Sequence, residues 1–222
     1  MGQKTTGSGV RLIHPQAIFF DFDGVIVESI DIKVQAFQDL YAEHGDEVVR
    51  KVIAYHKAHE GISRVIKIKN CHQALLGIDL GETEHRALCQ EYATIVEEKV
   101  VYCDGVAGAL EFLKTRDGRD RFFVASGTPE DELRRITARR ALDQFFSGVY
   151  GSPKKKDAIV TEILNKFGYD PSQCLFIGDA MTDLDAALAT NVPFIGRVGE
   201  GRHNPFPTGT RVIQDMTELN VD

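Results

Sequence analysis

The chain has 222 residues, of which 43% are hydrophobic and 27% are charged, and it carries a formal net charge of −7. This length and composition are typical of an ordinary soluble globular protein with one large domain or two smaller ones. The negative charge argues against nucleic acid or an anionic membrane as a partner, and no apolar stretch is long enough to span a membrane. The four cysteines have no metal-type spacing, so we expect reduced thiols in a cytoplasmic protein.

Two features come first along the chain. Residues 1–16 predict a flexible tail, because the segment up to Val10 is polar and rich in Gly, Ser and Thr. An apolar run at 17–20 then predicts a strand, and Asp21, Asp23 and Gly24 follow it directly.

The spacing of Asp21 and Asp23 carries the first functional signal. Alternate side chains of an extended segment point the same way, so both carboxylates can face one site, and Gly24 allows a sharp turn after them. Two carboxylates aimed together repel each other unless a cation or a proton lies between them. The pattern therefore favours a Mg²⁺ site, although a solvated Asp-x-Asp-Gly turn is a common alternative.

The region from Asp31 to Cys103 has helical periodicity almost throughout, and nothing in it indicates a strand. Within it, Ser63 can cap a helix on which Arg64 and Lys67 lie three residues apart, on one face. An arginine fork suits a carboxylate or a second phosphate on a substrate, and a lysine could assist as a point charge. We regard Arg64 and Lys67 as candidate substrate-binding residues, with a solvated helix face as the open alternative.

From Asp104 onward, short apolar runs alternate with helical patterns. Strands are predicted at Arg121–Ala125, Gly148–Tyr150, Cys174–Gly178, Val192–Gly196 and Arg211–Ile213. Helices are predicted between them at Val106–Lys114, Glu130–Arg140, Asp157–Phe167 and Asp183–Thr190. Such alternation predicts an α/β fold, in which a Rossmann-like parallel sheet is covered by helices on both faces.

The first strand must join this sheet, so the helical block is an insertion that lies over the strand ends. We therefore expect a core domain of residues 17–28 and 104–222 and an inserted all-helical cap of residues 29–103. Ligands of such sheets bind at the carboxyl ends of the strands.

The strand end at Ser126, Gly127 and Thr128 predicts an anion site. Ser126 offers a hydroxyl and Gly127 exposes a backbone N–H, while Thr128 and Pro129 resemble the N-cap and first residue of a helix. A helix N-terminus with free N–H groups attracts anions.

Two further strand ends carry charge. Lys154, Lys155 and Lys156 precede a helix, where cations oppose the helix dipole, so one of them could instead face a phosphate. Asp179 follows another strand, and Asp183 can reach the same site from a helix start.

In combination these motifs resemble the haloacid dehalogenase superfamily. The order Asp21-Phe22-Asp23-Gly24, then Ser126-Gly127-Thr128, then a lysine, then Gly178-Asp179-x-x-x-Asp183 matches its four motifs over residues 17 to about 213. The helical insertion resembles the cap of the subgroup that contains phosphoglycolate phosphatase and β-phosphoglucomutase.

The resemblance implies a role for each motif. Asp21 would be the nucleophile that forms an aspartyl-phosphate, and Asp23 the general acid and base. Mg²⁺ would be held by Asp21, the Asp23 carbonyl and Asp179, with waters as its remaining ligands, and Asp183 would bind it through water or hold the neighbouring residues. Ser126, the Gly127 N–H and a lysine would bind the phosphoryl oxygens; family members often read Gly-x-Pro-x-x-Lys here, which favours Lys156.

The implied function is a Mg²⁺-dependent phosphatase acting on a small phosphorylated metabolite. Members that break carbon–halogen bonds lack an aspartate at the position of Asp23, so a haloacid substrate is disfavoured. A phosphomutase of the β-phosphoglucomutase kind uses the same four motifs and remains the alternative. A non-catalytic binding protein on the same fold is a third possibility. The physiological substrate and the oligomeric state do not follow from the sequence.

Overall fold

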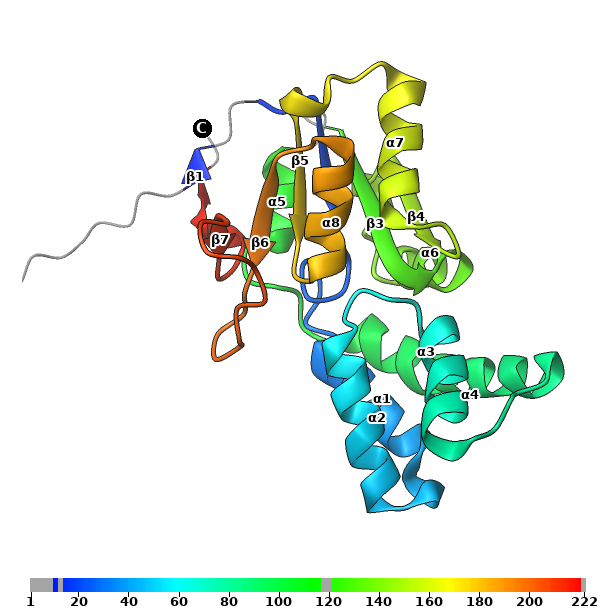
Figure 1. The fold of residues 1–222 in the computed structure, drawn as a ribbon. Coiled ribbons are helices and arrows are strands. Elements are labelled where there is room, and N and C mark those ends of the chain that lie inside the picture. Colours follow the sequence, from blue (N-terminus) through cyan, green and yellow to red (C-terminus); the bar gives the residue numbers. More distant parts are fainter. Residues whose placement is uncertain (1–9, 12–13, 117–120, 221–222) are drawn as a thin grey trace, which may run out of the picture.

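The computed structural model describes residues 10–11, 14–116 and 121–220. At its centre is a six-stranded sheet with the order β4-β3-β2-β5-β6-β7, in which every neighbouring pair is parallel (Figure 1). The strands are β2 (Ala17–Phe20), β3 (Phe122–Pro129), β4 (Gly148–Ser152), β5 (Cys174–Gly178), β6 (Phe194–Arg197) and β7 (Val212–Ile213). This confirms the predicted α/β fold.

Helices cover both faces of the sheet, because alternate residues of each strand point to opposite sides. Ile18 and Phe20 of β2 belong to one apolar cluster, and Ala17 and Phe19 belong to the other. The first cluster includes residues of α5 (Ala109–Thr115) and α6 (Glu130–Arg139), and the second includes residues of α7 (Lys156–Phe167) and α8 (Met181–Thr190). The strands are therefore buried on both sides, as their continuous apolar sequences require.

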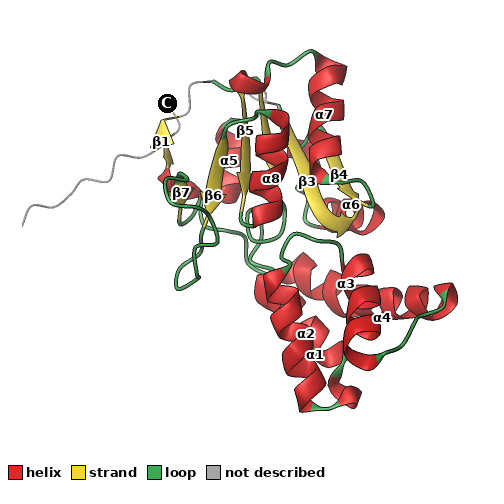
Figure 2. Ribbon diagram, viewed as in Figure 1, coloured by secondary structure: helices red, strands yellow, loops and turns green. Residues whose placement is uncertain are grey.

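Four further helices lie between β2 and α5 in the chain and gather beyond one end of the sheet (Figure 2). They are α1 (Ile30–Leu40), α2 (Asp46–Ala58), α3 (Arg64–Cys71) and α4 (Glu82–Tyr102). The two linkers that join them to the sheet lie side by side: Glu28 N donates to Asp104 O (2.9 Å) and Val106 N donates to Ile26 O (3.0 Å). We call this helical group the cap.

Two expectations are corrected by the structure. Thr128 does not cap a helix: it lies in β3, and α6 begins at Glu130 with Pro129 at the N-cap. Extended pairing with β4, where Pro129 lies opposite Ser152, holds the segment in strand conformation.

The predicted tail is wrong at Val10–Arg11, which form β1 and pair in parallel with β8 (Leu219–Asn220). Local composition gives no sign of such a distant partner. It is also wrong at Gln16, whose N–H donates to Gln173 O (2.7 Å) and whose Oε1 accepts from Asp170 N (2.9 Å). The prediction at 1–9 and 12–13 lies outside the described residues. Within the part of the chain that the structure describes, no helix is both long and apolar enough to cross a membrane.

Candidate active site

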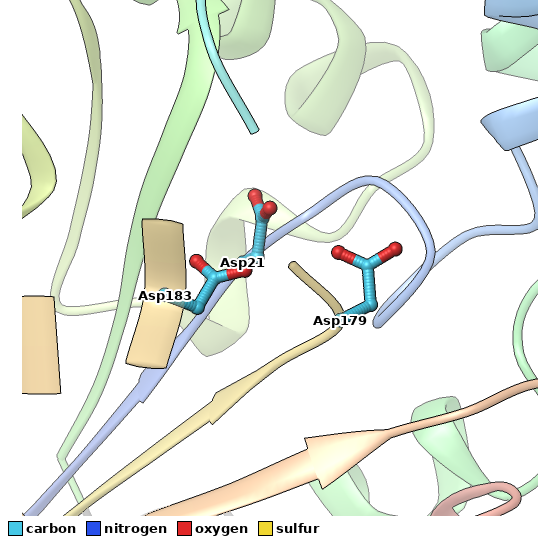
Figure 3. Close-up of side chains that lie close together, drawn as sticks. All are labelled: Asp21, Asp179 and Asp183. Carbon is cyan, nitrogen blue, oxygen red and sulfur yellow. The ribbon is translucent and has the colours of Figure 1, made fainter. Parts of the chain in front are cut away.

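Three carboxylates converge at the carboxyl ends of β2 and β5 (Figure 3). Asp21 follows β2, Asp179 follows β5, and Asp183 lies in the first turn of α8; each offers an oxygen within 4.8 Å of the others. The adjacency of β2 and β5 brings the motifs together. Gly24 completes the turn at φ +74°, and a Cβ there would collide with the Asp179 carboxylate.

The electrostatics of this cluster favour a bound cation. Burial and the neighbouring charges of Asp21 and Asp183 raise the pKa of Asp179 well above its usual value. Burial also raises the pKa of Asp183, although Lys156 opposes that shift. An all-oxygen set of converging carboxylates is what Mg²⁺ prefers, so the donors present fit this ion.

Lys156 reaches the same cluster from the start of α7. Its Nζ donates to Asp21 Oδ2 (2.7 Å) and to Asp183 Oδ1 (2.5 Å), and the residue is only 6% exposed. Burial lowers the pKa of Lys156, but the charges of Asp183 and Asp21 outweigh that effect and raise it. Lys154 and Lys155 are exposed, and Lys154 pairs with Glu162. Lys156 is thus the lysine of this run that faces the carboxylates.

The Asp23 carboxylate is held away from that cluster by polar side chains. Oδ1 accepts from Ser29 Oγ (2.6 Å), Oδ2 accepts from Thr128 Oγ1 (2.9 Å), and Lys33 forms an ion pair with Oδ2. Burial opposes ionisation, yet Lys33 and these hydrogen bonds hold the pKa of Asp23 below its usual value. Sequence reasoning missed Lys33, which α1 brings from the cap; only its position in the first turn of a helix close after Asp23 could have suggested it.

The predicted anion-binding residues lie beside Asp23. Ser126 is 1% exposed, its Oγ lies 3.5 Å from Asp23 Oδ2, and it accepts a hydrogen bond from Thr128 N (3.2 Å). A Cβ on Gly127 would collide with the carbonyl oxygen of Gly61, which belongs to the cap. The loop before α3 therefore lies directly on β3 at Gly127.

A cavity of about 60 Å³ remains between cap and sheet. Its sheet side is formed by Asp21, Asp23, Ser126, Gly127, Thr128, Pro129 and Asp179. Its cap side is formed by Ile30, Lys33, Phe37, His56, Glu60, Gly61, Ile62, Arg64, Lys67 and Tyr92.

Both candidate cations of α3 line this cavity, in different environments. Arg64 forms a bidentate ion pair with Glu132 of α6, whose side chain is 3% exposed. Arg64 Nη1 donates to Glu132 Oε1 (2.9 Å), and Nη2 donates to Oε2. Lys67 is 3% exposed, and its Nζ lies 3.1 Å from His56 Nδ1. Burial lowers the pKa of Lys67 to about 7 and that of His56 to about 3.

Comparison with known proteins agrees with this geometry. Residues 15–190 match the haloacid dehalogenase-like hydrolase family, so the chain belongs to that family, as the motif resemblance predicted. Among curated relatives, a phosphoglycolate phosphatase of Pseudomonas savastanoi pv. phaseolicola is 25% identical over 92% of this chain and 78% of its own length. A phosphorylated carbohydrates phosphatase of Thermotoga maritima is 22% identical over 80% of this chain and 82% of its own.

Solved structures share the fold. The β-phosphoglucomutase of Clostridium difficile superimposes with a TM-score of 0.74 at 18% identity, covering 93% of both chains. CbbY of Rhodobacter sphaeroides, solved in complex with phosphate, superimposes with a TM-score of 0.71 at 16% identity, covering 92% of this chain and 96% of its own.

Proposed function

We propose that this protein is a Mg²⁺-dependent phosphatase that hydrolyses a small phosphorylated metabolite through an aspartyl-phosphate on Asp21. The observation that carries the proposal is the convergence of Asp21, Asp179, Asp183 and Lys156 at the strand ends, with Asp23 and Ser126 beside them. Bound Mg²⁺, held by Asp21, Asp179, the Asp23 carbonyl and Asp183, would supply positive charge against the carboxylates and the phosphoryl oxygens.

The residues of the chain account for both half-reactions. In the first, an Asp21 oxygen bonds to phosphorus while the bond to the leaving oxygen breaks, and that oxygen takes a proton from Asp23. In the second, Asp23 takes a proton from water, the water oxygen bonds to phosphorus, and the Asp21 carboxylate is released. Ser126, the Gly127 N–H and Lys156 would stabilise the negative charge of the phosphoryl oxygens throughout.

The size of the cavity supports a small substrate. The cavity between cap and sheet is small, about 60 Å³, and side chains of the cap line it opposite Asp21 and Asp23. The names of the curated relatives, which include phosphoglycolate phosphatase, also support a small substrate.

A phosphomutase remains the second candidate, because a β-phosphoglucomutase shares the fold. A mutase must hold a second phosphate in the cap, and Arg64 is the cap residue best suited to it. The Glu132 carboxylate already neutralises Arg64, which favours the phosphatase.

The four cysteines, all within the described residues, are unpaired, which supports the cytoplasmic location expected from the sequence.

Hydrolysis of 4-nitrophenyl phosphate tests the proposal. Wild-type protein should release 4-nitrophenol in the presence of Mg²⁺, and this hydrolysis should stop in excess EDTA. No turnover under any divalent cation would support the non-catalytic alternative, and full activity in EDTA would contradict the metal requirement. A panel of phosphorylated metabolites, followed by both phosphate release and isomer formation, then separates phosphatase from mutase.

A further inference from the structure

A buried arginine outside the four motifs contacts the turn that carries Asp23. Arg197 is the last residue of β6 and is 6% exposed. Its Nη1 donates to the carbonyl oxygen of Gly24 (3.2 Å) and to Glu28 Oε2 (3.1 Å), and its Nη2 donates to Glu28 Oε1 (2.5 Å). Its Nε donates to the carbonyl oxygen of Gln214 (2.9 Å). The guanidinium thus ties the C-terminal part of the chain to both ends of one short turn.

That turn bears on Asp23 from two directions. At one end, Gly24 is the residue directly after Asp23, so a contact that fixes the Gly24 carbonyl also restrains the backbone of Asp23. At the other end, Ser29 follows Glu28, and Ser29 Oγ donates to Asp23 Oδ1 (2.6 Å). A planar fork with a bidentate carboxylate partner fixes geometry more tightly than a single point charge does.

We infer that Arg197 is a positioning residue for Asp23: it holds the turn at 24–28 so that the Asp23 carboxyl faces the leaving oxygen. The inference rests on the proposed function, in which Asp23 protonates that oxygen. Arg197 need not touch the substrate, and it does not line the cavity beside Asp21 and Asp23. A positioning role predicts loss of proton transfer in particular, and not a uniform loss of activity.

Two aryl phosphates of similar shape can isolate proton transfer. Phenol is a weak acid, with a pKa near that of tyrosine, about 10, whereas 4-nitrophenol is a much stronger acid and leaves without help. The parameter to compare is kcat/KM, because it covers the steps up to departure of the alcohol and excludes hydrolysis of the aspartyl-phosphate.

Arg197→Met should lower kcat/KM for phenyl phosphate by about 100-fold and for 4-nitrophenyl phosphate by less than about 10-fold, since general acid catalysis contributes about 10²–10⁴-fold. Asp23→Asn should show the same discrimination more strongly. Arg197→Lys, which keeps the charge and loses the fork, should recover only part of the phenyl phosphate activity. Arg202→Met is the matched control, because the side chain of Arg202 is 37% exposed and pairs with the exposed Asp31. It should change kcat/KM for neither substrate.

Glu28→Gln tests the same fork if Arg197→Met does not fold. It leaves Arg197 in place and should give the same preference for 4-nitrophenyl phosphate at smaller amplitude. Equal losses on both substrates, in either variant, would overturn the inference and reduce Arg197 to a contributor to folding. If the wild type hydrolyses neither phosphate, the proposed function fails and this inference fails with it.

Discussion

Both oxygens of Asp21 are engaged by donors of the core, which orients the carboxylate. Oδ1 accepts from the N–H of Phe22 (2.6 Å) and Oδ2 accepts from Lys156 Nζ (2.7 Å). The side chain is also buried, with only 4% exposed. A carboxylate held in this way suits the nucleophilic role that we propose for Asp21.

Asp21→Asn should therefore abolish turnover of 4-nitrophenyl phosphate while the protein stays folded. An amide has almost the same shape but is a far weaker nucleophile, so we expect the rate to fall by at least about 100-fold. Initial rates and circular dichroism on the same samples provide the measurement. Asp185→Asn is the control, because Asp185 is an exposed residue of α8. A variant that keeps more than about a hundredth of the wild-type rate would rule out Asp21 as the nucleophile.

Lys67 is buried beside the neutral imidazole of His56, so a positive charge on Lys67 lowers the stability of the folded protein. Burial lowers the pKa of Lys67 from the ordinary 10.5 to about 7, and the positive charge of Lys33 adds to this shift. Between these two pKa values the unfolded chain binds a proton that the folded chain does not. The contribution of Lys67 to the free energy of unfolding therefore rises with pH across this window and is least favourable at pH 7 and below.

Lys67→Met should be more stable than wild type at pH 6, and this advantage should shrink by about 2.7 kcal/mol at pH 9, because the window covers about two pKa units of about 1.4 kcal/mol each. Methionine fills a similar volume without a charge. Urea denaturation of both proteins at the two pH values measures the difference. Lys69→Met, an exposed lysine of the same helix, should show no comparable trend. An advantage that grows with pH would contradict the low pKa of Lys67.

At the scale of elements, α3 of the cap is held against α6 of the core. Arg64 and Glu132 form the ion pair, with side chains 11% and 3% exposed, and Ser63 Oγ lies 2.9 Å from Ser152 Oγ of β4. The loop before α3 also packs against Gly127 and Thr182. These contacts join the cap to the core around the cavity, so they determine how tightly the site is covered.

Glu132→Gln should weaken this junction, because it leaves the Arg64 charge with a neutral partner in a buried position. We expect the free energy of unfolding to fall by about 1–3 kcal/mol and KM to rise for all phosphate esters alike. Thermal denaturation and steady-state kinetics measure the two effects. Glu98→Gln is the control, since Glu98 pairs with Arg139 on an exposed surface, and it should have little effect.

Arg64→Ala separates the two roles that Arg64 can have. If Arg64 binds an anionic group of the substrate, Arg64→Ala should raise KM for the true metabolite and scarcely change it for 4-nitrophenyl phosphate, which has no second anion. If Arg64 mainly joins cap to core, Arg64→Ala and Glu132→Gln should each raise KM for both substrates by similar factors. A double-mutant cycle between the two positions measures the coupling directly.

At the scale of the whole molecule, periodicity and motif order predict the fold and most of the residues that converge at the strand ends. Four of these residues follow a strand whose apolar pattern is clear in the sequence: Asp21, Asp23, Asp179 and Asp183. Ser126 follows the apolar part of β3, which the structure extends to Pro129. Parallel pairing then gathers them at one edge.

What the sequence does not predict are contacts between segments far apart in the chain. Lys33 meets Asp23 and Thr128, and Arg64 meets Glu132, because the cap and the sheet fold against one another. Arg197 meets Gly24 and Glu28 because the fold brings the end of β6 to the turn that follows β2. A charged residue on a helix or at a strand end has the same local signature whether it is solvated or paired. Thr128 was misassigned for a related reason: its neighbours resemble a helix start, whereas pairing with β4 extends the strand.

The proposed Mg²⁺ site predicts that the stability of the whole molecule depends on this ion. Burial raises the pKa of Asp179 and Asp183, and repulsion among Asp21, Asp179 and Asp183 adds to the rise. A divalent cation that binds the folded state and not the unfolded chain raises the free energy of unfolding, by about 2.7 kcal/mol at a concentration of 100 times Kd. For a protein of this length, that corresponds to a Tm increase of about 5–10 °C.

Differential scanning calorimetry with and without MgCl₂ should show this increase, and EDTA should reverse it. Asp179→Asn removes one carboxylate from the cluster, so the variant should be at least as stable as wild type without metal and should gain much less on adding Mg²⁺. Asp157→Asn, which alters an aspartate of α7 outside the cluster, should keep the full gain. An equal gain in wild type and Asp179→Asn would mean that the ion binds elsewhere, because the loss of a ligand must reduce the affinity of the site that it belongs to.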